Sequence, residues 1–265
     1  MCASFSEKEY KINNEEVIVK MISAIKSIKT LKYTLKNTER INGKLLTGLQ
    51  EIKYQASPLK CYVHMKSPNP GSELLFVKGV NNNKAIYNPN GFPYFKMNLD
   101  PMGSLMRKNN HHTIYEVGFK TMAKIITKGY KEKNYSFTYK GDTIWNRINC
   151  HIFSISNTNF KIKSYTVKEK ETIKSIAKKY QISEYMILEL NQKLSDFNDD
   201  LTLNQKIMIP TTYAKEIELY IDKKTFLPVF QKISDNKGLY EQYEYSNLKL
   251  NPTISDEEFT PAIFD

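Results

Sequence analysis

The sequence predicts an α+β protein built mainly on antiparallel strands. Over long stretches, apolar residues alternate with polar ones, and turn sequences such as Asn42-Gly43 separate the alternating runs. Within this pattern, only residues 15–28 and 113–128 carry apolar residues at helical spacing. Between residues 165 and 210 the pattern changes to a short strand–helix–helix–strand order. We therefore expect one antiparallel β domain packed on two helices, with a small unit inserted into it.

A stripe of aliphatic residues predicts the first helix, over residues 15–28. Asn14 is suited to cap this helix, and the acidic Glu15 and Glu16 favour its positive end. An aliphatic stripe of this kind normally docks a helix on a core. Its members are Ile18, Met21, Ile22, Ile25 and Ile28.

A meander of strands is expected after the first helix. The Asn42-Gly43 turn joins the first two strands, and prolines mark the later breaks. The expected strands cover about residues 31–35, 52–56, 60–66, 73–80, 84–88 and 92–98. The meander is followed by the second helix, 113–128, whose apolar face would hold Tyr115, Phe119, Met122 and Ile126.

Further strands are expected on both sides of the inserted unit. Before it lie strands at 134–140 and 143–156, the second with apolar residues on both faces and therefore expected to be buried on both. After it, three strands at 216–222, from 227 and at 239–250 form a meander. These should continue the sheet from the strand that ends near residue 156.

The inserted segment resembles a LysM domain. It reads Tyr165-Thr166-Val167, then Ser175-Ile176-Ala177-Lys178-Lys179-Tyr180, then Leu188-Glu189-Leu190-Asn191, and it closes with Gln205-Lys206-Ile207-Met208-Ile209-Pro210. Ser183 is a plausible N-cap for the second helix. The resemblance implies a βααβ fold over 165–210 that binds N-acetylglucosamine-containing glycans such as peptidoglycan. The implied groove residues are Lys170, Glu171, Thr172, Ile173, Asn191, Leu201, Thr202 and Leu203.

Three departures from the LysM pattern separate its fold from its binding activity. Lys170, Gln181 and Asn204 stand where the family commonly has glycine. Glycine permits positive φ and lets a sugar approach the backbone, so side chains here would reshape the groove. A LysM fold kept only as a packing or partner module is the alternative.

The segments outside the insert resemble lipoprotein-carrier (LolA-like) envelope proteins, in particular a domain-of-unknown-function branch of them. The resemblance is carried by Leu219 to Thr225, Leu227-Pro228-Val229, Asp235 to Gly238 and Tyr243 to Leu248. It implies a discontinuous antiparallel half-barrel, 1–164 and 211–265, around a cavity for acyl chains of lipids or lipoproteins. The implied lining is Ile18, Ile22, Ile25, Tyr33, Ile52, Tyr54, Tyr115, Phe119 and Met122. A closed, filled core is the alternative.

The basic charge of the chain is concentrated in one segment. Residues 1–164 carry 26 basic and 11 acidic groups, residues 165–210 carry 7 of each, and residues 211–265 carry 6 and 10. A basic surface suits an anionic membrane as a further partner, although a solvated lysine surface explains it equally well. No RNA-binding aromatic signature or Arg-rich helix occurs, so nucleic acid is not expected as a partner.

Catalytic and metal-binding motifs are absent from the sequence. There is no GxSxG, P-loop, GxGxxG or HExxH, so we expect neither an enzyme nor a cofactor. The adjacent His111 and His112 are interpreted as surface polar groups, because neighbours point in different directions. Cys61 and Cys150 leave a disulfide open, and Cys2 would be lipidated if a lipobox preceded it.

These observations predict a non-enzymatic protein of the periplasm or cell envelope. No export signal is visible in the sequence, and we expect that one has been removed. The half-barrel would hold an acyl chain or other apolar ligand, and the LysM-like module would associate with peptidoglycan. The alternative is a structural or partner-interaction protein of the envelope in which neither site binds a small ligand.

Overall fold

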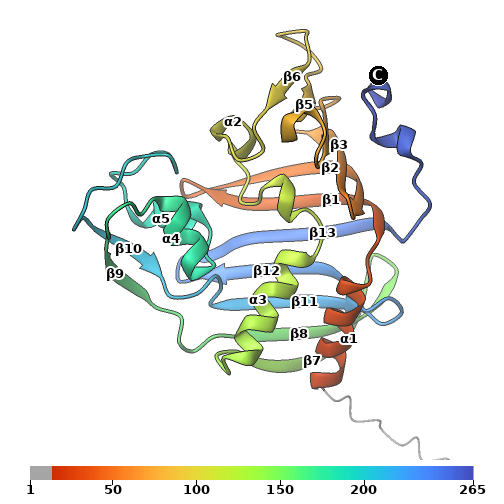
Figure 1. The fold of residues 1–265 in the computed structure, drawn as a ribbon. Coiled ribbons are helices and arrows are strands. Elements are labelled where there is room, and N and C mark those ends of the chain that lie inside the picture. The colour runs from red at the N-terminus through yellow and green to blue at the C-terminus, as the bar shows by residue number, and fades with distance from the viewer. Residues whose placement is uncertain (1–13, 265) are drawn as a thin grey trace, which may run out of the picture.

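The computed structural model describes residues 14–264, and its largest element is an antiparallel sheet of 11 strands that does not close. The strand order is β6-β5-β4-β3-β2-β1-β13-β12-β11-β8-β7, so β6 and β7 are its edges (Figure 1). The first strand, β1, pairs antiparallel with the last strand, β13, so the N-terminal and C-terminal strands are neighbours in the sheet. The α+β class is confirmed, and the unclosed sheet is consistent with the expected half-barrel.

The sheet contains strands of very different length. They are β1 Thr30–Ile41, β2 Lys44–Ala56, β3 Leu59–Ser67, β4 Glu73–Val77, β5 Ala85–Asn88, β6 Met97–Leu99, β7 Ser136–Trp145, β8 Ile148–Ser156, β11 Glu216–Asp222, β12 Pro228–Asp235 and β13 Gly238–Leu250. The helices outside the insert are α1 Asn14–Lys26, α2 Ser104–Arg107 and α3 Lys120–Lys131. Short 3-10 turns are η1 Asn81–Asn83, η2 Ile114–Glu116, η3 Asp256–Phe259 and η4 Pro261–Ile263.

The expected hairpins form where turn residues can adopt positive φ. Asn42 and Gly43 have φ of 51° and 76° and join β1 to β2, as predicted. The last three strands form the predicted meander, and β11 pairs with β8. Residues 157–215 therefore connect two neighbouring antiparallel strands, which is the topology expected for an insert.

The second helix is shorter than predicted and begins later. The expected helix over 113–128 is wrong at its start, because Gly118 has φ of 91° and interrupts the chain between η2 and α3. Tyr115 therefore lies in η2 and does not share a helix face with Phe119 and Met122. Of the predicted apolar stripe, only the part from Phe119 onward belongs to the helix.

The expected break between β7 and β8 is also misplaced. The register shift between Tyr139 and Gly141 forms a bulge within β7, and the chain turns instead at Asn146 and Arg147, both of positive φ. Ile144 consequently lies on the edge strand and is 72% exposed, so the prediction of a strand buried on both faces was wrong here. β6 is likewise shorter than the expected strand at 92–98.

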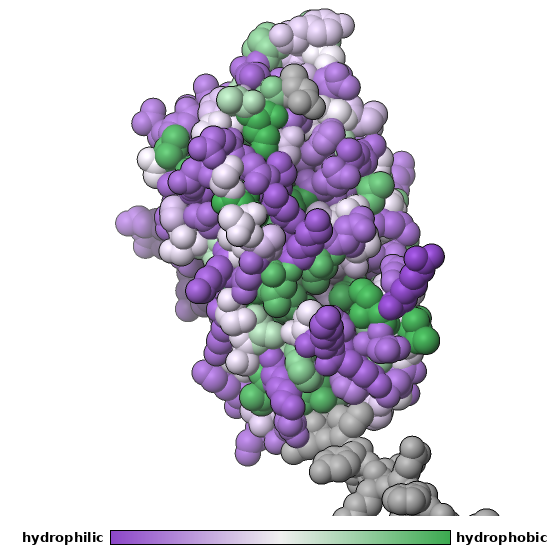
Figure 2. All heavy atoms as spheres, turned by 90° about the vertical axis from the view of Figure 1, so that its right-hand side faces the viewer, coloured by the Kyte–Doolittle hydropathy of each residue, from purple (hydrophilic) through white to green (hydrophobic). Residues whose placement is uncertain are grey.

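Two helices cover one face of the sheet and enclose the main core. Figure 1 shows α1 and α3 in front of the strands β11, β8 and β7, and the two helices contact each other. Met21 and Ile25 of α1 and Ile126 of α3 are fully buried there together with Phe153 of β8. The face seen in Figure 2 is mainly hydrophilic, with scattered hydrophobic side chains. The N-cap predicted at Asn14 concerns a side chain outside the described residues.

The inserted segment forms a strand–helix–helix–strand unit. Its elements are β9 Ile162–Thr166, α4 Ile173–Tyr180, α5 Glu184–Leu190 and β10 Lys206–Pro210, and β9 and β10 pair antiparallel. Ser183 caps α5, as predicted, by accepting a hydrogen bond from the backbone N–H of Tyr185. The first strand begins at Ile162, ahead of the expected boundary at residue 165.

The core beneath α3 should respond to small truncations. Ile126→Ala removes a fully buried side chain, and we expect it to lower the free energy of unfolding by about 2–5 kcal/mol. The matched variant Ile144→Ala should cost about 0.5 kcal/mol or less, since its side chain faces solvent. Urea unfolding followed by circular dichroism measures both, and equal losses would show that α3 does not close the core.

Candidate functional site

A cavity of about 720 Å³ lies between the sheet and the segments that contain α2 and α3. Strands β1 to β6 contribute one wall, and β12 and β13 extend it. Residues of α2, η2 and α3 form the opposite wall. This volume is within the range of roughly 300–1,000 Å³ typical of small-molecule pockets.

Strand pairing arranges the sheet wall in rows of increasing polarity. The first row is apolar and runs through cross-strand partners Tyr33, Ile52, Val63, Leu74 and Tyr87. Because side chains on one face recur at every second residue, β1 adds Leu35, Asn37 and Glu39 in order. The wall therefore changes from apolar to acidic along β1.

The polar rows are continued by the neighbouring strands. Asn37 pairs in register with Tyr243, which in turn pairs with Gln231, and all three line the cavity. Glu39 pairs with Glu241, which also lines it. Two buried carboxylates thus stand side by side at one end of the cavity, where like charges repel.

Hydrogen-bond donors surround these two carboxylates. The backbone N–H of His111 donates to Glu39 at 2.7 Å, and the Tyr243 hydroxyl donates to it at 2.6 Å. Glu241 accepts from the Tyr213 hydroxyl, and its Oε2 lies 2.9 Å from Nδ1 of His111. These donors give each oxygen of the two carboxylates a hydrogen-bond partner.

The charges in this cluster shift the pKa values of its members. Burial alone would raise the pKa of Glu241, but His112 and His111 outweigh it and hold the pKa well below the usual range. Burial would lower the pKa of His112, but Glu241 and Glu116 raise it well above its usual value. Burial and the charge of Glu241 both raise the pKa of Tyr213, which therefore remains a neutral donor.

The two histidines were assigned wrongly from the sequence. His111 is 2% exposed, with its ring between Glu241 and the backbone carbonyl of Arg40, and His112 is partly buried with Nε2 3.4 Å from Glu241. Both therefore approach one carboxylate, although they are adjacent in sequence. No local pattern identifies Glu241 as their partner, since it lies 130 residues from His111. Among residues 14–264, no cluster suited to a metal ion was found.

The expected cavity-lining residues divide into two groups. Tyr33, Ile52 and Met122 line the cavity. The others do not line it: Ile18, Ile25, Tyr54 and Phe119 are buried in the core, Ile22 packs against that core, and Tyr115 is exposed. Helix α1 therefore closes a filled part of the half-barrel. Whether any of these residues contacts a ligand stays a prediction.

The expected groove residues of the insert also differ in their surroundings. Lys170, Thr172, Thr202 and Leu203 are exposed, and Leu201 is partly buried. Ile173 is fully buried, and Glu171 accepts hydrogen bonds from Tyr165 and Lys179. The Asn191 side chain bonds to backbone groups of Ile187 and Met208 and so connects α5 to β10. A glycan role for these residues stays a prediction.

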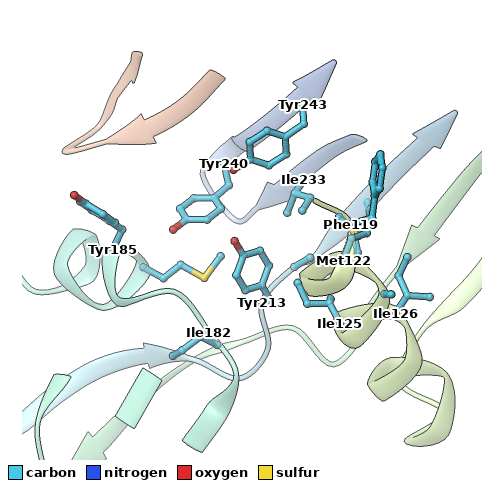
Figure 3. Close-up of a cluster of buried hydrophobic side chains, with 14 of the residues drawn as sticks. Phe119, Met122, Ile125, Ile126, Ile182, Tyr185, Tyr213, Ile233, Tyr240 and Tyr243 are labelled. Atoms are coloured by element: carbon cyan, nitrogen blue, oxygen red, sulfur yellow. The ribbon is translucent and has the colours of Figure 1, made fainter. Parts of the chain in front are cut away.

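The insert packs firmly on the half-barrel through α5. Arg40 of β1 forms ion pairs with Glu189 of α5 and with Asp235, and Arg107 pairs with Glu184 of α5. The Tyr185 hydroxyl donates to the backbone carbonyl of Arg107. Figure 3 shows the aromatic side chains of α5, β13 and the segment after β10 leading without a break to α3, so the two parts share a core.

The fold and the cavity define a class, an unclosed antiparallel half-barrel with an internal pocket. The particular family follows from the sequence comparison. The family model described as "Protein of unknown function (DUF1571)" matches residues 28–263, and the chain belongs to this family. No curated protein matched the chain.

The chain is similar to several solved structures, each at low identity and with a TM-score below 0.5. A putative outer membrane lipoprotein-sorting protein domain from Vibrio parahaemolyticus has 10% identity and a TM-score of 0.38, covering 95% of this chain and 99% of that one. Lipoprotein LppX of Mycobacterium tuberculosis has 11% identity and a TM-score of 0.44, covering 91% of this chain and 97% of that one. A LolA superfamily protein from Nitrosomonas europaea has 8% identity and a TM-score of 0.36, covering 95% of this chain and 99% of that one.

No helix within the described residues 14–264 is long and apolar enough to cross a membrane. Cys61 and Cys150 are both free and buried, so the disulfide left open by the sequence is not formed. Cys2 lies outside the described residues.

The shifted pKa of His112 should make stability depend on pH. Its pKa in the folded protein lies above the value of 6.5 expected when unfolded, so the stabilisation is fully present below pH 6.5 and is lost as the pH rises through the folded-state pKa. Urea unfolding should therefore show a smaller fall in stability between pH 6 and pH 9 for His112→Gln than for the wild type. Identical falls would remove His112 from the charge cluster.

Proposed function

We propose that this protein is a non-enzymatic cell-envelope protein that holds a lipid, a lipoprotein acyl chain or another apolar ligand in its half-barrel cavity. The single observation that carries the proposal is the cavity of about 720 Å³ with an apolar row at one end. Large apolar faces are usually filled by neighbouring side chains, and this one leaves space for a ligand. The ligand class is the one that the LolA-like sequence resemblance implies, and the cavity itself does not depend on that resemblance.

The insert is proposed to be a LysM-type module that associates with peptidoglycan. Its strand–helix–helix–strand order with paired outer strands supports the fold. Lys170, Gln181 and Asn204 have φ of 62°, 54° and 65°, the backbone region that glycine occupies most easily. At these three positions the backbone therefore has the conformation that glycine favours, although each residue carries a side chain.

The module is docked on the half-barrel, and this determines how the whole would work in the envelope. Ion pairs and a shared core hold α5 in place, so association with the cell wall would fix the orientation of the cavity as well as its location. The charge of the basic segment 1–164 suits an anionic membrane surface nearby. In this proposal, the compartment is the periplasm or the wider cell envelope.

Ligand binding in the cavity is tested by filling it. Val63 is buried in the apolar row, and Val63→Trp should weaken binding of the fluorescent probe N-phenyl-1-naphthylamine by about tenfold, or ~1.4 kcal/mol. The matched variant Ile144→Trp lies on the exposed edge strand and should bind as the wild type does. If the Val63→Trp variant folds and binds the probe as tightly as the wild type, the structural or partner-interaction role becomes the better hypothesis.

Peptidoglycan association is tested with point variants, because removal of the module would open the shared core. Lys170→Glu with Leu203→Glu changes two exposed positions near the expected groove, and should reduce pelleting with insoluble peptidoglycan by roughly fivefold. Lys178→Glu with Leu45→Glu makes the same charge change elsewhere on the surface and should pellet normally. Equal pelleting of the two double variants would exclude the groove.

A further inference from the structure

The acidic end of the cavity contains a carboxylate whose cationic partner is missing from the described residues. Glu39 is 3% exposed and lines the cavity. Within residues 14–264, its recorded donors are both neutral, the backbone N–H of His111 and the hydroxyl of Tyr243. Arg40, the next residue, is held by Glu189 and Asp235 instead. A buried carboxylate is normally paired with a cation, so its position on a cavity wall points to a ligand.

Two buried amides in the row next to that of Glu39 also have unused hydrogen-bonding groups. Asn37 is 7% exposed and Gln231 is 3% exposed, and both line the cavity. Among the described residues, Asn37 Nδ2 donates no hydrogen bond and Gln231 Oε1 accepts none. Buried polar groups are satisfied in most proteins, and groups on a cavity wall can be satisfied by a ligand that the cavity holds.

Gly48 keeps the Asn37 amide in this position. A Cβ atom on Gly48 would lie 2.6 Å from Oδ1 of Asn37, which is too close for a van der Waals contact. The absence of a side chain on β2 therefore lets Asn37 extend across that strand and line the cavity. The β1–β2 pairing places Asn37 opposite Gly48, and so sets the position of Asn37 in the polar row.

The polar end is also the end that opens to solvent. Leu46, which pairs with Glu39 across the β1–β2 ladder, is exposed and lines the cavity together with the exposed Thr47, Lys108 and Asn109. The apolar row at Tyr33 is buried. An amphiphile would therefore enter with its chain toward Tyr33 and leave its head between Asn37 and Glu39.

We propose that the cavity takes an amphiphile with a cationic amine head, and that Glu39 is the anionic partner of that amine. This inference rests on the proposed ligand-binding function and names its ligand class. The amides of Asn37 and Gln231 complete the subsite, one as donor and one as acceptor, for the group that links head and chain. His112 offsets part of the negative charge of Glu241 and Glu116, and Glu39 is left for the ligand.

The experiment compares three ligands that share one chain and differ only in the head. Dodecylamine, dodecan-1-ol and dodecanoic acid are titrated at pH 7 against the full chain loaded with N-phenyl-1-naphthylamine. We expect the amine to displace the probe at a roughly tenfold lower concentration than the alcohol, and the acid to be weakest. The net charge of +11 would favour the acid if binding were only attraction to the surface, so the expected order is specific to the subsite.

A matched pair of variants locates the preference. Glu39→Gln should bring the amine and the alcohol to equal affinity while the alcohol itself binds as before. Glu73→Gln is the control, because Glu73 is equally buried and accepts from Tyr62 and Asn88, yet does not line the cavity. If Glu39→Gln does not fold, the order of affinities of the three ligands for the wild type still tests the preference for an amine head.

The outcomes separate the two proposals. An acid that binds as tightly as the amine, or an amine preference that survives Glu39→Gln, overturns the amine subsite and leaves the apolar cavity standing. Failure of the probe and of all three ligands to bind overturns the ligand-binding function itself, and the subsite with it.

Discussion

The structure depends on how two opposed carboxylates are kept together in the interior. Glu39 and Glu241 are register partners on the first and last strands of the sheet, and both are almost fully buried. Their repulsion would open the β1–β13 ladder unless donors from elsewhere compensated for it. Those donors come from His111, before η2, and from Tyr213, after the insert. Sheet, loop and insert therefore depend on one another through this cluster.

This arrangement gives the insert a structural role whether or not it binds a glycan. The segment that follows β10 supplies Tyr213 to Glu241, and α5 presses Tyr185 against the ring of His111 at 5.5 Å between centroids. Arg40 and Arg107 then connect the half-barrel to α5 through ion pairs with little solvent around them. Removal of one partner from such a pair would leave an uncompensated buried charge, which is strongly destabilising. The insert thus defines how the polar wall of the cavity is built.

Much of the fold was accessible from the sequence, because strand alternation and turn chemistry act locally. The Asn42-Gly43 hairpin and the Ser183 cap follow from single residues and their neighbours. The failures occurred where one residue overrode a pattern, as Gly118 did for the helix predicted at 113–128. The charge cluster was out of reach, since Glu39 and Glu241 become neighbours only when the first and last strands pair.

The location of the cavity follows from the same long-range pairing. The LolA-like resemblance implied that the apolar face of α1 lines the cavity. The helical stripe itself indicates burial without saying what lies opposite it. In the structure, α1 packs against α3 and β7, so its stripe fills space, and the open volume lies farther along the sheet, over β1 to β6. There the walls include the short strands β4 to β6 and the four-residue helix α2. The polar row of Asn37, Tyr243 and Gln231 crosses this region, and its uncompensated hydrogen-bonding groups oppose collapse onto an apolar surface. A pocket that is apolar at its buried end and polar at its open end is therefore a consequence of the strand register itself.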